Sequence, residues 1–480
     1  MMMQVGIYQP NQETCFCNNA GWKILCEQEK FPHKYTNQPD CPIILFERCT
    51  PSWFSSFVEE GGIGVVSDYL PDNPPLHVQY AGEASVEYVD LSELDGGSNT
   101  RVQCLMSLYS GNGWGKIRVH ENRIQKTGIT QDEYPVFLYQ RSGKGGYFYS
   151  GLPFSRLITV WGDTLRKCST FSDYSERIVS IDKHYLLKSM RAILIKAFHQ
   201  HKRPYVYLDY FPNGYQSAVT FRVDVDGVFG ENLLNLSKSA IANEIKLTFF
   251  INKSLCEGDE KCIQAIDPYH EVGNHANVHN LFSDYESNYQ NVLACKLWLE
   301  KLGYSNNPWF AAPRGLWNHP LHQALEDLAY VYTSDFGVGI AGFPFFPYIN
   351  GKRSHTLQIP VHPFSAERAS LWRSESEGKE ATPEFVADYY EKIIEENYSL
   401  NYPSMLYSHP EKLGEMANFV FERIHQKISS RNIWKTTLTE FALWWKQRDN
   451  TEFEINHDLS SKKIAITGNL DHTINIKEIY

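Results

Sequence analysis

The sequence predicts an α/β fold in three parts: a distorted (β/α) barrel over residues 211–450, an N-terminal α/β domain over residues 1–165, and a short C-terminal β appendage over residues 451–480. The barrel is predicted because strand-like and helix-like segments alternate regularly there, as they do where helices join parallel strands. A strand–helix–strand pass predicts the N-terminal domain, and apolar residues at every second position predict the appendage.

The N-terminal domain begins with the apolar run CPIILFERC, which is typical of a strand. Thr50 and Pro51 suit the cap and first turn of a helix, and GGIGVVSDYLP then indicates a glycine stop before a second buried strand. A helix between two strands favours parallel pairing. PVFLYQRSGKGGYFYSGLP predicts a hairpin with SGKGG as its turn. The segment contains no nucleophile elbow, and it resembles the non-catalytic glutamine-amidotransferase-like domains of larger enzymes, which implies a scaffolding or substrate-shaping role.

Residues 166–210 are predicted to be a helical linker between the two domains. Apolar side chains recur there at helical spacing, at Leu186, Leu187, Met190, Ile193, Leu194 and Phe198. Pro204 ends the pattern, because a helix interior does not accommodate proline.

The barrel elements follow in order. The predicted strands are AVTFRVDVDG, KLTFFIN, PWFAAPRG, YVYTSDF and SMLYSHP, and the predicted helices are ENLLNLSKSAIANEI, NYQNVLACKLWLEKLG, HPLHQALEDLA, PEFVADYYEKIIEEN and EKLGEMANFVFERIHQKI. After FALWWKQRD the apolar period changes to two, with SS and GN as turns, which predicts a short antiparallel appendage.

Composition excludes several classes of function. The formal net charge of −11 provides no electrostatic footprint for nucleic acid or an anionic membrane surface. We expect no transmembrane segment and no secretory signal, and therefore a cytoplasmic protein. The ten cysteines include no C-x-x-C pair, and although Cys15, Cys17 and Cys26 have some zinc-site character, free thiols are the favoured interpretation.

The stretch FRVDVDG places Arg222, Asp224 and Asp226 on one face of a predicted strand, since side chains alternate across a strand. Inside a barrel such charges are costly unless a cation or strong hydrogen bonds compensate them. Taken alone, the motif is equally consistent with a solvated strand end and with a metal-binding site.

The stretch HEVGNHANVHNLF places His275 and His279 four residues apart, and on a helix both imidazoles would lie on one side. The spacing is frequent by chance, and alone it favours a structural pair over a metal site. Ala276 stands where a zincin has its catalytic glutamate, so a general base has to come from elsewhere.

The combination is more informative than either motif. Asp226, His275 and His279 form a three-ligand set of the kind that holds a catalytic metal and leaves one position open. Asp224 is then a second carboxylate beside the metal, available as a base. His409 follows another predicted strand, and catalytic groups of barrels gather at the carboxyl ends of strands.

The motifs TFRVDVDG, HEVGNHANVH, FAAPRGLW, YTSDF and YSHP, in this order, resemble those of the polysaccharide deacetylase family (NodB-homology domain, family 4 carbohydrate esterases) across residues 211–450. The resemblance implies that Asp226, His275 and His279 bind a divalent metal, usually Zn²⁺, with Co²⁺ and Ni²⁺ as alternatives. It also implies that Asp224 is the general base and that His409 protonates the leaving amine.

The same resemblance gives roles to two further residues. Asp335 would help to orient the catalytic groups, and a backbone N–H near Arg314 would stabilise the oxyanion together with the metal. We expect Arg314, Trp317 and Pro313 of the third motif to contact the substrate.

The sequence departs from the family pattern in the residues around this site. Ala311 stands where the family commonly has an arginine that supports the base, Arg314 where an aromatic residue is usual, and Ala276 where the family has Ser or Thr. We expect Arg222 to take over the support of Asp224. Arg314 is equally consistent with a contact to an anionic substrate group and with a surface arginine.

These expectations describe a metal-dependent hydrolase that removes an N-acyl group, foremost N-acetyl, from a carbohydrate or sugar conjugate in surface polysaccharide or glycoconjugate biosynthesis. Two alternatives remain at this point. One is a non-catalytic carbohydrate-binding or scaffold protein, and the other is an amidohydrolase that uses the same site on a non-sugar C–N bond. The sequence does not indicate an oligomeric state.

Overall fold

The computed structural model describes residues 4–10, 19–68, 78–84, 89–90, 114–119, 125–130, 135–161, 163–167, 175–179, 181–227, 230–305, 307–336, 339, 342–458, 463–468 and 474–479. The chain divides into two compact units. The first comprises Met1–Val160, Ser180–Asp209 and Arg448–Tyr480, and the second comprises Trp161–Val179 and Tyr210–Gln447. The C-terminal end of the chain therefore returns to the unit in which the chain begins.

The first unit is built around a mixed sheet with the strand order β2-β1-β3-β4-β10-β9-β8-β6. Its parallel strands are β1 (Val5–Tyr8), β2 (His33–Thr36), β3 (Ile43–Glu47), β4 (Ile63–Ser67) and β10 (Gly145–Ser150). The antiparallel strands are β9 (Pro135–Ser142), β8 (Gln125–Thr130) and β6 (Val89–Asp90). A separate pair consists of β5 (Val78–Ala84) and β7 (Trp114–Val119). Two predictions are confirmed here: the strand–helix–strand pass and the hairpin formed by β9 and β10.

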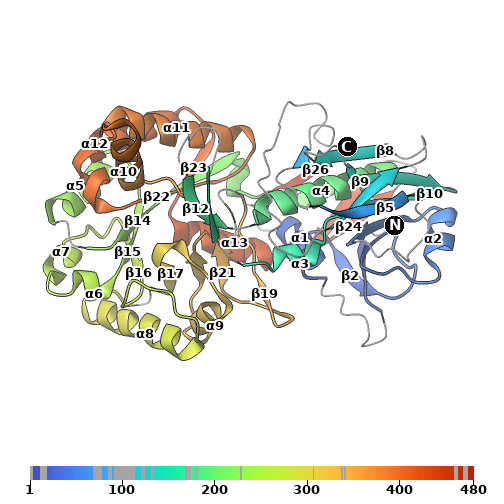
Figure 1. Ribbon diagram of the computed structural model, residues 1–480, viewed down its shortest axis with the longest axis horizontal. Coiled ribbons are helices and arrows are strands. Elements are labelled where there is room, and N and C mark those ends of the chain that lie inside the picture. The colour runs from blue at the N-terminus through green and yellow to red at the C-terminus, as the bar shows by residue number, and fades with distance from the viewer. Residues whose placement is uncertain are drawn as a thin grey trace. The chain divides into compact units, whose positions relative to one another are not determined.

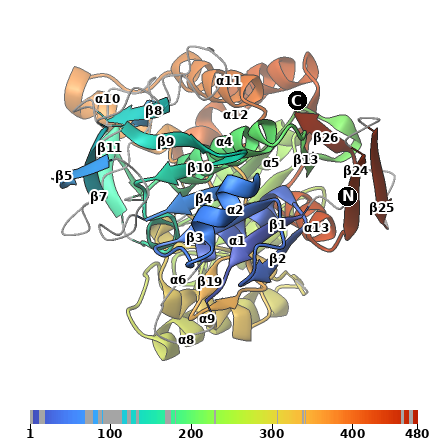
Figure 2. The same ribbon diagram turned by 90° about the vertical axis from the view of Figure 1, so that its right-hand side faces the viewer.

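The helices of the first unit are α1 (Ala20–Glu29), α2 (Phe54–Glu60), α3 (Phe154–Ile158) and α4 (Lys183–Gln200). Figure 2 shows α2 over the sheet. Phe54 and Phe57 of this helix belong to one apolar cluster with Phe46 of β3. The helix predicted after residue 180 is confirmed as α4, whose N-cap Asp182 accepts the backbone N–H of His184 at 3.0 Å. Helix α4 packs against β4 and β10 of this unit.

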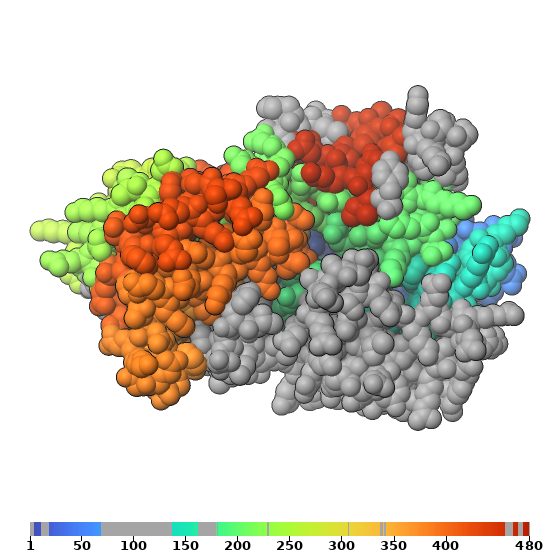
Figure 3. All heavy atoms as spheres, turned by 90° about the horizontal axis from the view of Figure 1, so that it is seen from above, coloured from blue at the N-terminus to red at the C-terminus, as the bar shows by residue number. Residues whose placement is uncertain are grey.

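The C-terminal segment contains the predicted antiparallel pair, β24 (Phe453–Asp458) and β25 (Lys463–Gly468), and one further strand. This strand, β26 (Ile476–Ile479), pairs antiparallel with β13 (Tyr205–Leu208). Figure 3 shows the segment in red against the green residues of the first unit that include α4. Arg448, 1% exposed, fastens the segment by donating to the carbonyl oxygens of Leu208, Asp209 and Gln28.

The second unit contains a curled parallel sheet with the order β21-β18-β17-β16-β15-β14-β22, and β23 also pairs with β14. Its strands are β14 (Ser217–Val225), β15 (Leu247–Ile251), β16 (Glu271–Asn274), β17 (Trp309–Ala311), β18 (Tyr332–Ser334), β21 (Leu357–Ile359), β22 (Ser404–Ser408) and β23 (Ile433–Lys435). The two edge strands of this sheet, β21 and β22, lie close together: the N–H of His362, just after β21, donates to the carbonyl oxygen of Met405 in β22 at 2.9 Å. The predicted α/β fold with a distorted (β/α) barrel is confirmed.

Helices surround this sheet in Figure 1. They are α5 (Gly230–Ala242), α6 (Lys253–Cys256), α7 (Glu260–Gln264), α8 (Tyr285–Lys301), α9 (His319–Asp327), α10 (Ala366–Glu377), α11 (Pro383–Ser399), α12 (Pro410–Ser429) and α13 (Leu438–Asp449). The smaller elements are the strand pairs β11 (Asp163–Lys167) with β12 (Ser175–Val179) and β19 (Tyr348–Ile349) with β20 (Lys352–Arg353). None of the described helices combines the length and the apolar character needed to cross a membrane.

Strand β14 shows the alternation that the sequence predicts. Phe221, Val223 and Val225 belong to the apolar core between the sheet and the helices α5, α11 and α12. Arg222 and Asp224 point to the other face, and both are buried. The packing of the apolar face thus fixes the register that places the charged face inside the barrel.

One local expectation is wrong. The stretch around His275 and His279 is not helical: β16 ends at Asn274, and residues 275–280 form an irregular loop before α8. Ala276 has a positive φ of 66°, a conformation that no helix accommodates.

Candidate metal centre

Polar side chains gather where three parallel strands end. Asp226 follows β14, His275 and His279 follow β16, and His409 follows β22. Because neighbouring parallel strands end at the same edge of a sheet, these residues meet at the carboxyl end of the barrel.

The carboxylate of Asp226 lies at the centre of the cluster. Its Oδ1 is 3.2 Å from Nε2 of His275, and its Oδ2 is 3.2 Å from Nε2 of His279. The Nε2 atom of His409 is 3.7 Å from Oδ2. One ligand atom from each of Asp226, His275 and His279 lies within 4.8 Å of the other two, close enough for a single cation to contact all three.

The closest atoms of this cluster have no hydrogen-bond partner among the described residues. They are Oδ1 of Asp226 and the two Nε2 atoms of His275 and His279, and all three are buried. Polar atoms in this situation are costly unless a ligand satisfies them. Two imidazoles and one carboxylate are ligands that Zn²⁺ and related divalent metals accept, so the donor set fits such a metal.

A hydrogen bond to the backbone of β17 sets the orientation of the His275 ring. Its Nδ1 lies 2.9 Å from the carbonyl oxygen of Ala311 in β17, and since a carbonyl can only accept, Nδ1 carries the hydrogen. In the neutral ring Nε2 then holds the free lone pair, as a metal ligand requires.

Asparagine side chains hold the loop that carries both histidines. Asn274 accepts the N–H of Ala276 at 2.7 Å, which stabilises the positive φ there, and Asn252 donates to the carbonyl oxygen of His275. Further along the loop, Val278 is held by Asn291 of α8, whose side chain accepts the N–H of Val278 and donates to its carbonyl oxygen. These hydrogen bonds bring two histidines together without a helix.

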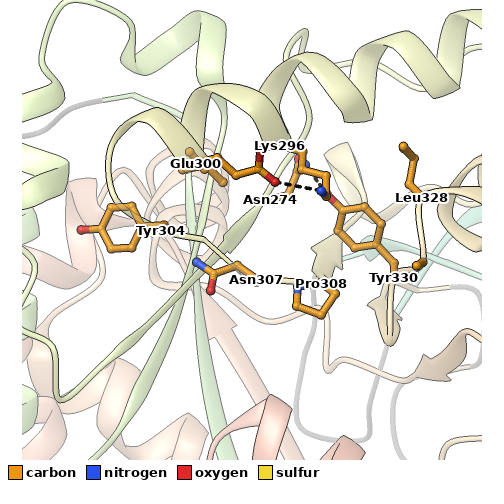
Figure 4. A pocket seen from close by; sticks show the side chains of 10 residues that line it. Asn274, Lys296, Glu300, Tyr304, Asn307, Pro308, Leu328 and Tyr330 are labelled. Atoms are coloured by element: carbon orange, nitrogen blue, oxygen red, sulfur yellow. Dashed lines mark hydrogen bonds and ion pairs between the residues drawn. The ribbon is translucent and has the colours of Figure 1, made fainter.

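Asn274 also faces a cavity, which Figure 4 shows. The cavity has a volume of about 220 Å³ and is lined mainly by α8 and by the segments that flank β17 and β18. At its wall Asn274 donates to the hydroxyl of Tyr330 at 2.6 Å and to the carbonyl oxygen of Val292. The support of the histidine loop therefore extends to the outer layer of the barrel.

A buried ion pair lies beside the cluster. Nη2 of Arg222 donates to Oδ2 of Asp224 at 2.8 Å, and Nη1 donates to the carbonyl oxygen of Ser334 at 2.7 Å. The guanidinium also lies over the rings of Phe250 and Tyr407. Oδ1 of Asp224 accepts no hydrogen bond from the described residues. Arg222 therefore holds Oδ2, and Oδ1 remains available to accept a proton.

His409 is oriented by Glu367 of α10. Its Nδ1 donates to Oε2 of Glu367 at 3.3 Å. The same carboxylate accepts the hydroxyl of Ser408 and the backbone N–H groups of His409, Lys412 and Leu413. Glu367 therefore caps the N-terminus of α12 from outside that helix and fixes the histidine that precedes it.

Electrostatics favours the charged forms of Asp226 and His409. Burial raises the pKa of Asp226, but the imidazoles of His275, His279 and His409 outweigh burial and lower the pKa. Burial lowers the pKa of His409, but the hydrogen bond and charge of Glu367 outweigh it and raise the pKa to about 9. Asp226 thus offers a full negative charge to a cation, and His409 carries a proton at neutral pH.

Comparison with protein families gives one match to this part of the chain. Residues 228–333 match the family model described as polysaccharide deacetylase. The second unit contains a polysaccharide deacetylase domain. The matched segment includes His275, His279 and Arg314 and ends before His409.

Solved structures with a similar fold were also found for the deacetylase domain. A Mycobacterium smegmatis protein described as a polysaccharide deacetylase is 17% identical over 50% of this chain and 93% of its own, with a TM-score of 0.45. The allantoinase PuuE is 15% identical over 50% and 93%, with a TM-score of 0.41. A family 4 carbohydrate esterase pseudoenzyme from Bacillus anthracis is 14% identical over 48% and 68%, with a TM-score of 0.33. No curated protein matches the chain.

The remaining predicted residues of the deacetylase domain differ in their burial. Asp335 is fully buried after β18 and accepts hydrogen bonds from Thr333 and Gln358. Arg314 is exposed after β17, and its charge contributes to lowering the pKa of His279, after burial and the charge of His275. Arg314 has a φ of 58°, and the next residue, Gly315, has a φ of 64°.

Trp317 and Pro313 are buried and shape the loop of the deacetylase domain that carries Arg314. The indole N–H of Trp317 donates to Nδ1 of His322 at 3.1 Å, and its ring packs on Trp161. A Cβ at Gly315 would lie 2.3 Å from the ring of Phe336, so only glycine fits there. The face of Trp317 is therefore covered by protein.

Sequence reasoning missed Glu367. It lies in SAERASLW at the start of helix α10, which was not predicted because this helix has little apolar periodicity. The N-cap Ser365, which accepts the N–H of Arg368, was the available signal for this helix.

Proposed function

We propose that the second unit is a metal-dependent hydrolase that removes an N-acyl group, foremost N-acetyl, from a carbohydrate. The observation that carries this proposal is the convergence of Asp226, His275 and His279 in a polysaccharide deacetylase domain, where their facing atoms have no hydrogen-bond partner among the described residues. A donor set of two imidazoles and one carboxylate suits catalytic Zn²⁺, and Co²⁺ and Ni²⁺ accept the same ligands.

In this proposal Asp226, His275 and His279 hold the metal. When bound, a divalent metal supplies Lewis acidity, which polarises a carbonyl and makes water more acidic. The chain's own residues supply the proton transfers and the orientation, and two pairs of side chains share this work.

The first pair is Asp224 with Arg222. Asp224 acts as the general base toward the attacking water, with Oδ1 as the accepting atom, because Oδ2 is already bonded to Arg222. Arg222 in turn is anchored to the carbonyl oxygen of Ser334 and supports the base in place of the arginine that the family commonly has at Ala311. Asp335, buried behind the same strand ends, contributes to this arrangement as a positioning residue.

The second pair is His409 with Glu367. His409 gives a proton from Nε2 to the leaving nitrogen, since Nδ1 is bonded to Glu367 and Nε2 faces the metal ligands. A protonated imidazole at neutral pH, as the raised pKa of His409 provides, is the form that a general acid needs.

Substrate contacts come from the loop after β17. Arg314 is exposed, and its charge acts on the ligand His279, so in this proposal it contacts the substrate at the open side of the centre. Trp317 and Pro313 act through the shape of this loop. None of the six described cysteines forms a disulfide, which is in keeping with action in the reducing cytoplasm on a precursor of a surface polysaccharide or glycoconjugate.

The decisive experiment offers metal-loaded protein a panel of N-acetyl sugars and their nucleotide conjugates, with acetate release as the readout, and a set of cyclic ureides, with ring opening as the readout. Turnover of a sugar that disappears after chelation and returns with Zn²⁺ supports the proposal. Turnover of a ureide alone would identify an amidohydrolase of non-sugar bonds. Stoichiometric metal and sugar binding without any turnover would identify a carbohydrate-binding protein.

A further inference from the structure

Glu411 lies beside the metal centre and has no role in the reaction described above. It is the second residue of α12, two positions after His409. One of its carboxylate oxygens lies within 4.8 Å of a ring nitrogen of His409 and of a carboxylate oxygen of Glu367. Its Oε2 is buried and accepts no hydrogen bond from any described residue. A buried carboxylate oxygen without a donor costs about 1–3 kcal/mol, so the position favours an external partner.

The backbone of Glu411 is held firmly in place. Asn232 of α5 donates from Nδ2 to its carbonyl oxygen at 2.8 Å, and Pro410 begins the helix just before it. Burial raises the pKa of Glu411, a hydrogen bond from its own backbone N–H and the charge of His409 lower it, and the carboxylates of Glu367 and Asp226 raise it. The side chain is therefore close enough to the reacting groups to feel their charges.

A second metal site is the first explanation to consider, because Glu367, His409 and Glu411 could surround an ion. Glu367 excludes it. Both of its oxygens already accept hydrogen bonds, from one hydroxyl, one imidazole and three backbone N–H groups. A metal would have to displace the cap of α12, and Nδ1 of His409 carries the hydrogen that this carboxylate accepts.

In the proposed reaction Glu411 lies on the amine side of the C–N bond that is cleaved. In the proposed reaction His409 gives its proton to the leaving nitrogen, so groups around His409 face the amine part of the substrate. An acceptor at this place recognises a hydrogen-bond donor of the amine product, not of the acyl group.

Resting on the proposed N-deacylation, we propose that Glu411 accepts a hydrogen bond from a substrate hydroxyl on the carbon next to the N-acyl group. Glu411 is then a specificity-determining residue. It selects amino sugars with a free neighbouring hydroxyl over substrates that lack this donor.

The test compares the activity of four proteins on each of two substrates. The substrates are an N-acetyl amino sugar that the wild type accepts and its deoxy analogue without the neighbouring hydroxyl. The proteins are the wild type, Glu411→Ala, Glu411→Gln and, as a matched control, Glu415→Ala, one turn later on the same helix and exposed. Metal content is measured for each, and calorimetry measures binding of the two corresponding free amino sugars to each metal-loaded protein.

We expect the wild type and the control to prefer the hydroxyl-bearing sugar by about 10- to 100-fold in kcat/KM and in affinity, the range for a hydrogen bond to a charged group. Glu411→Ala reduces this preference to about twofold or less, Glu411→Gln keeps part of it, and the metal content of both is unchanged.

Full preference in Glu411→Ala would overturn the role of Glu411 and leave the deacylase proposal intact. Absence of acetate release by the wild type from every sugar would overturn the proposed function. In that case the calorimetric comparison still decides whether Glu411 reads the hydroxyl, because it needs binding and no turnover.

Discussion

Nδ1 of His275 and the carbonyl oxygen of Ala311 are 2.9 Å apart, so the backbone of β17 fixes the ring whose other nitrogen faces Asp226. This hydrogen bond lets a single buried imidazole present its lone pair in one direction only. It is the structural reason to expect a bound metal.

Metal content should therefore depend on Asp226 and His275. We expect about one equivalent of metal in the wild type and less than about 0.1 in Asp226→Ala and His275→Ala, because two ligands do not retain a divalent ion against dialysis. Elemental analysis after dialysis measures this. His355→Ala, which removes an exposed histidine side chain of the same unit, should keep full occupancy. Full occupancy in Asp226→Ala would reject the proposed site.

The base can be separated from the metal ligands. Asp224→Asn keeps the hydrogen bond to Arg222 but cannot take a proton, so we expect kcat to fall about 1000-fold or more with unchanged metal content. Arg222→Ala should lower kcat by about 10- to 100-fold by freeing the carboxylate. Asp388→Asn, an exposed aspartate of α11, serves as control. Wild-type turnover in Asp224→Asn would show that the base is another group.

Glu367 is expected to affect both stability and catalysis. Glu367→Ala removes the cap of α12 and the partner of His409, so we expect a loss of about 1–3 kcal/mol in the free energy of unfolding and a kcat lowered by about 10- to 100-fold. Glu367→Asp should restore part of kcat. Glu384→Ala, an exposed glutamate in the first turn of α11, should change neither quantity by a comparable amount. A stability loss without any loss of kcat would limit Glu367 to capping.

The histidine loop gives a prediction about metal affinity. Asn291→Ala removes two hydrogen bonds that hold Val278, next to His279, and we expect a metal affinity lower by about 10- to 100-fold in a folded protein. Tyr330→Phe, which removes the hydroxyl that Asn274 contacts, should have a smaller effect in the same direction. Competition with a chromophoric chelator measures both. Gln290→Ala, an exposed neighbour on α8, is the control, and equal affinity in all variants would contradict the supporting role of the loop.

Buried His322 predicts a pH dependence of stability. Burial lowers its pKa to about 3, below the value of 6.5 for an exposed histidine, so the unfolded chain binds the proton first as the pH falls. The contribution of His322 is fully present above pH 6.5 and is lost progressively toward pH 3, by on the order of 2 kcal/mol between pH 6.5 and 5.

Chemical unfolding at pH 7.5 and 5 tests this, with His322→Asn as the variant. Asn retains an acceptor for the indole N–H of Trp317 but does not titrate, so the loss of stability between the two pH values should be smaller than in the wild type. An unchanged difference would assign the pH dependence to other groups, such as the buried His184 and His362, whose pKa values burial also lowers to about 3.

The sequence predicted the strand β14 and its charged face because alternation over nine residues is a strong signal and the apolar half packs against three helices. It also placed Asp226 and His409 at strand ends, where the structure has them, whereas strand β16 before His275 was not predicted. The helical interpretation of residues 275–279 was wrong. Two histidines four residues apart can also come together in a loop, when asparagine side chains hold the backbone.

The partners of the site residues were the least predictable part. Glu367 and His409 are separated by 42 residues, and their contact depends on how α10 and α12 pack. The hydrogen bond between His275 and Ala311 uses a backbone carbonyl, for which the side chain at that position carries no information. Such contacts follow from tertiary structure, and no local pattern encodes them.

The pairing of β26 with β13, together with the bonds of Arg448, has a consequence for biosynthesis. The second unit is inserted in the chain of the first unit, whose last described strands, β24, β25 and β26, follow the insertion and are therefore synthesised after it. Chains usually fold from the N-terminus as they emerge from the ribosome. Here the N-terminal segment must wait while about 240 residues of the inserted unit are synthesised, since a complete α/β domain forms only when its missing part arrives. Assembly of this protein is thus expected to run from the middle outward.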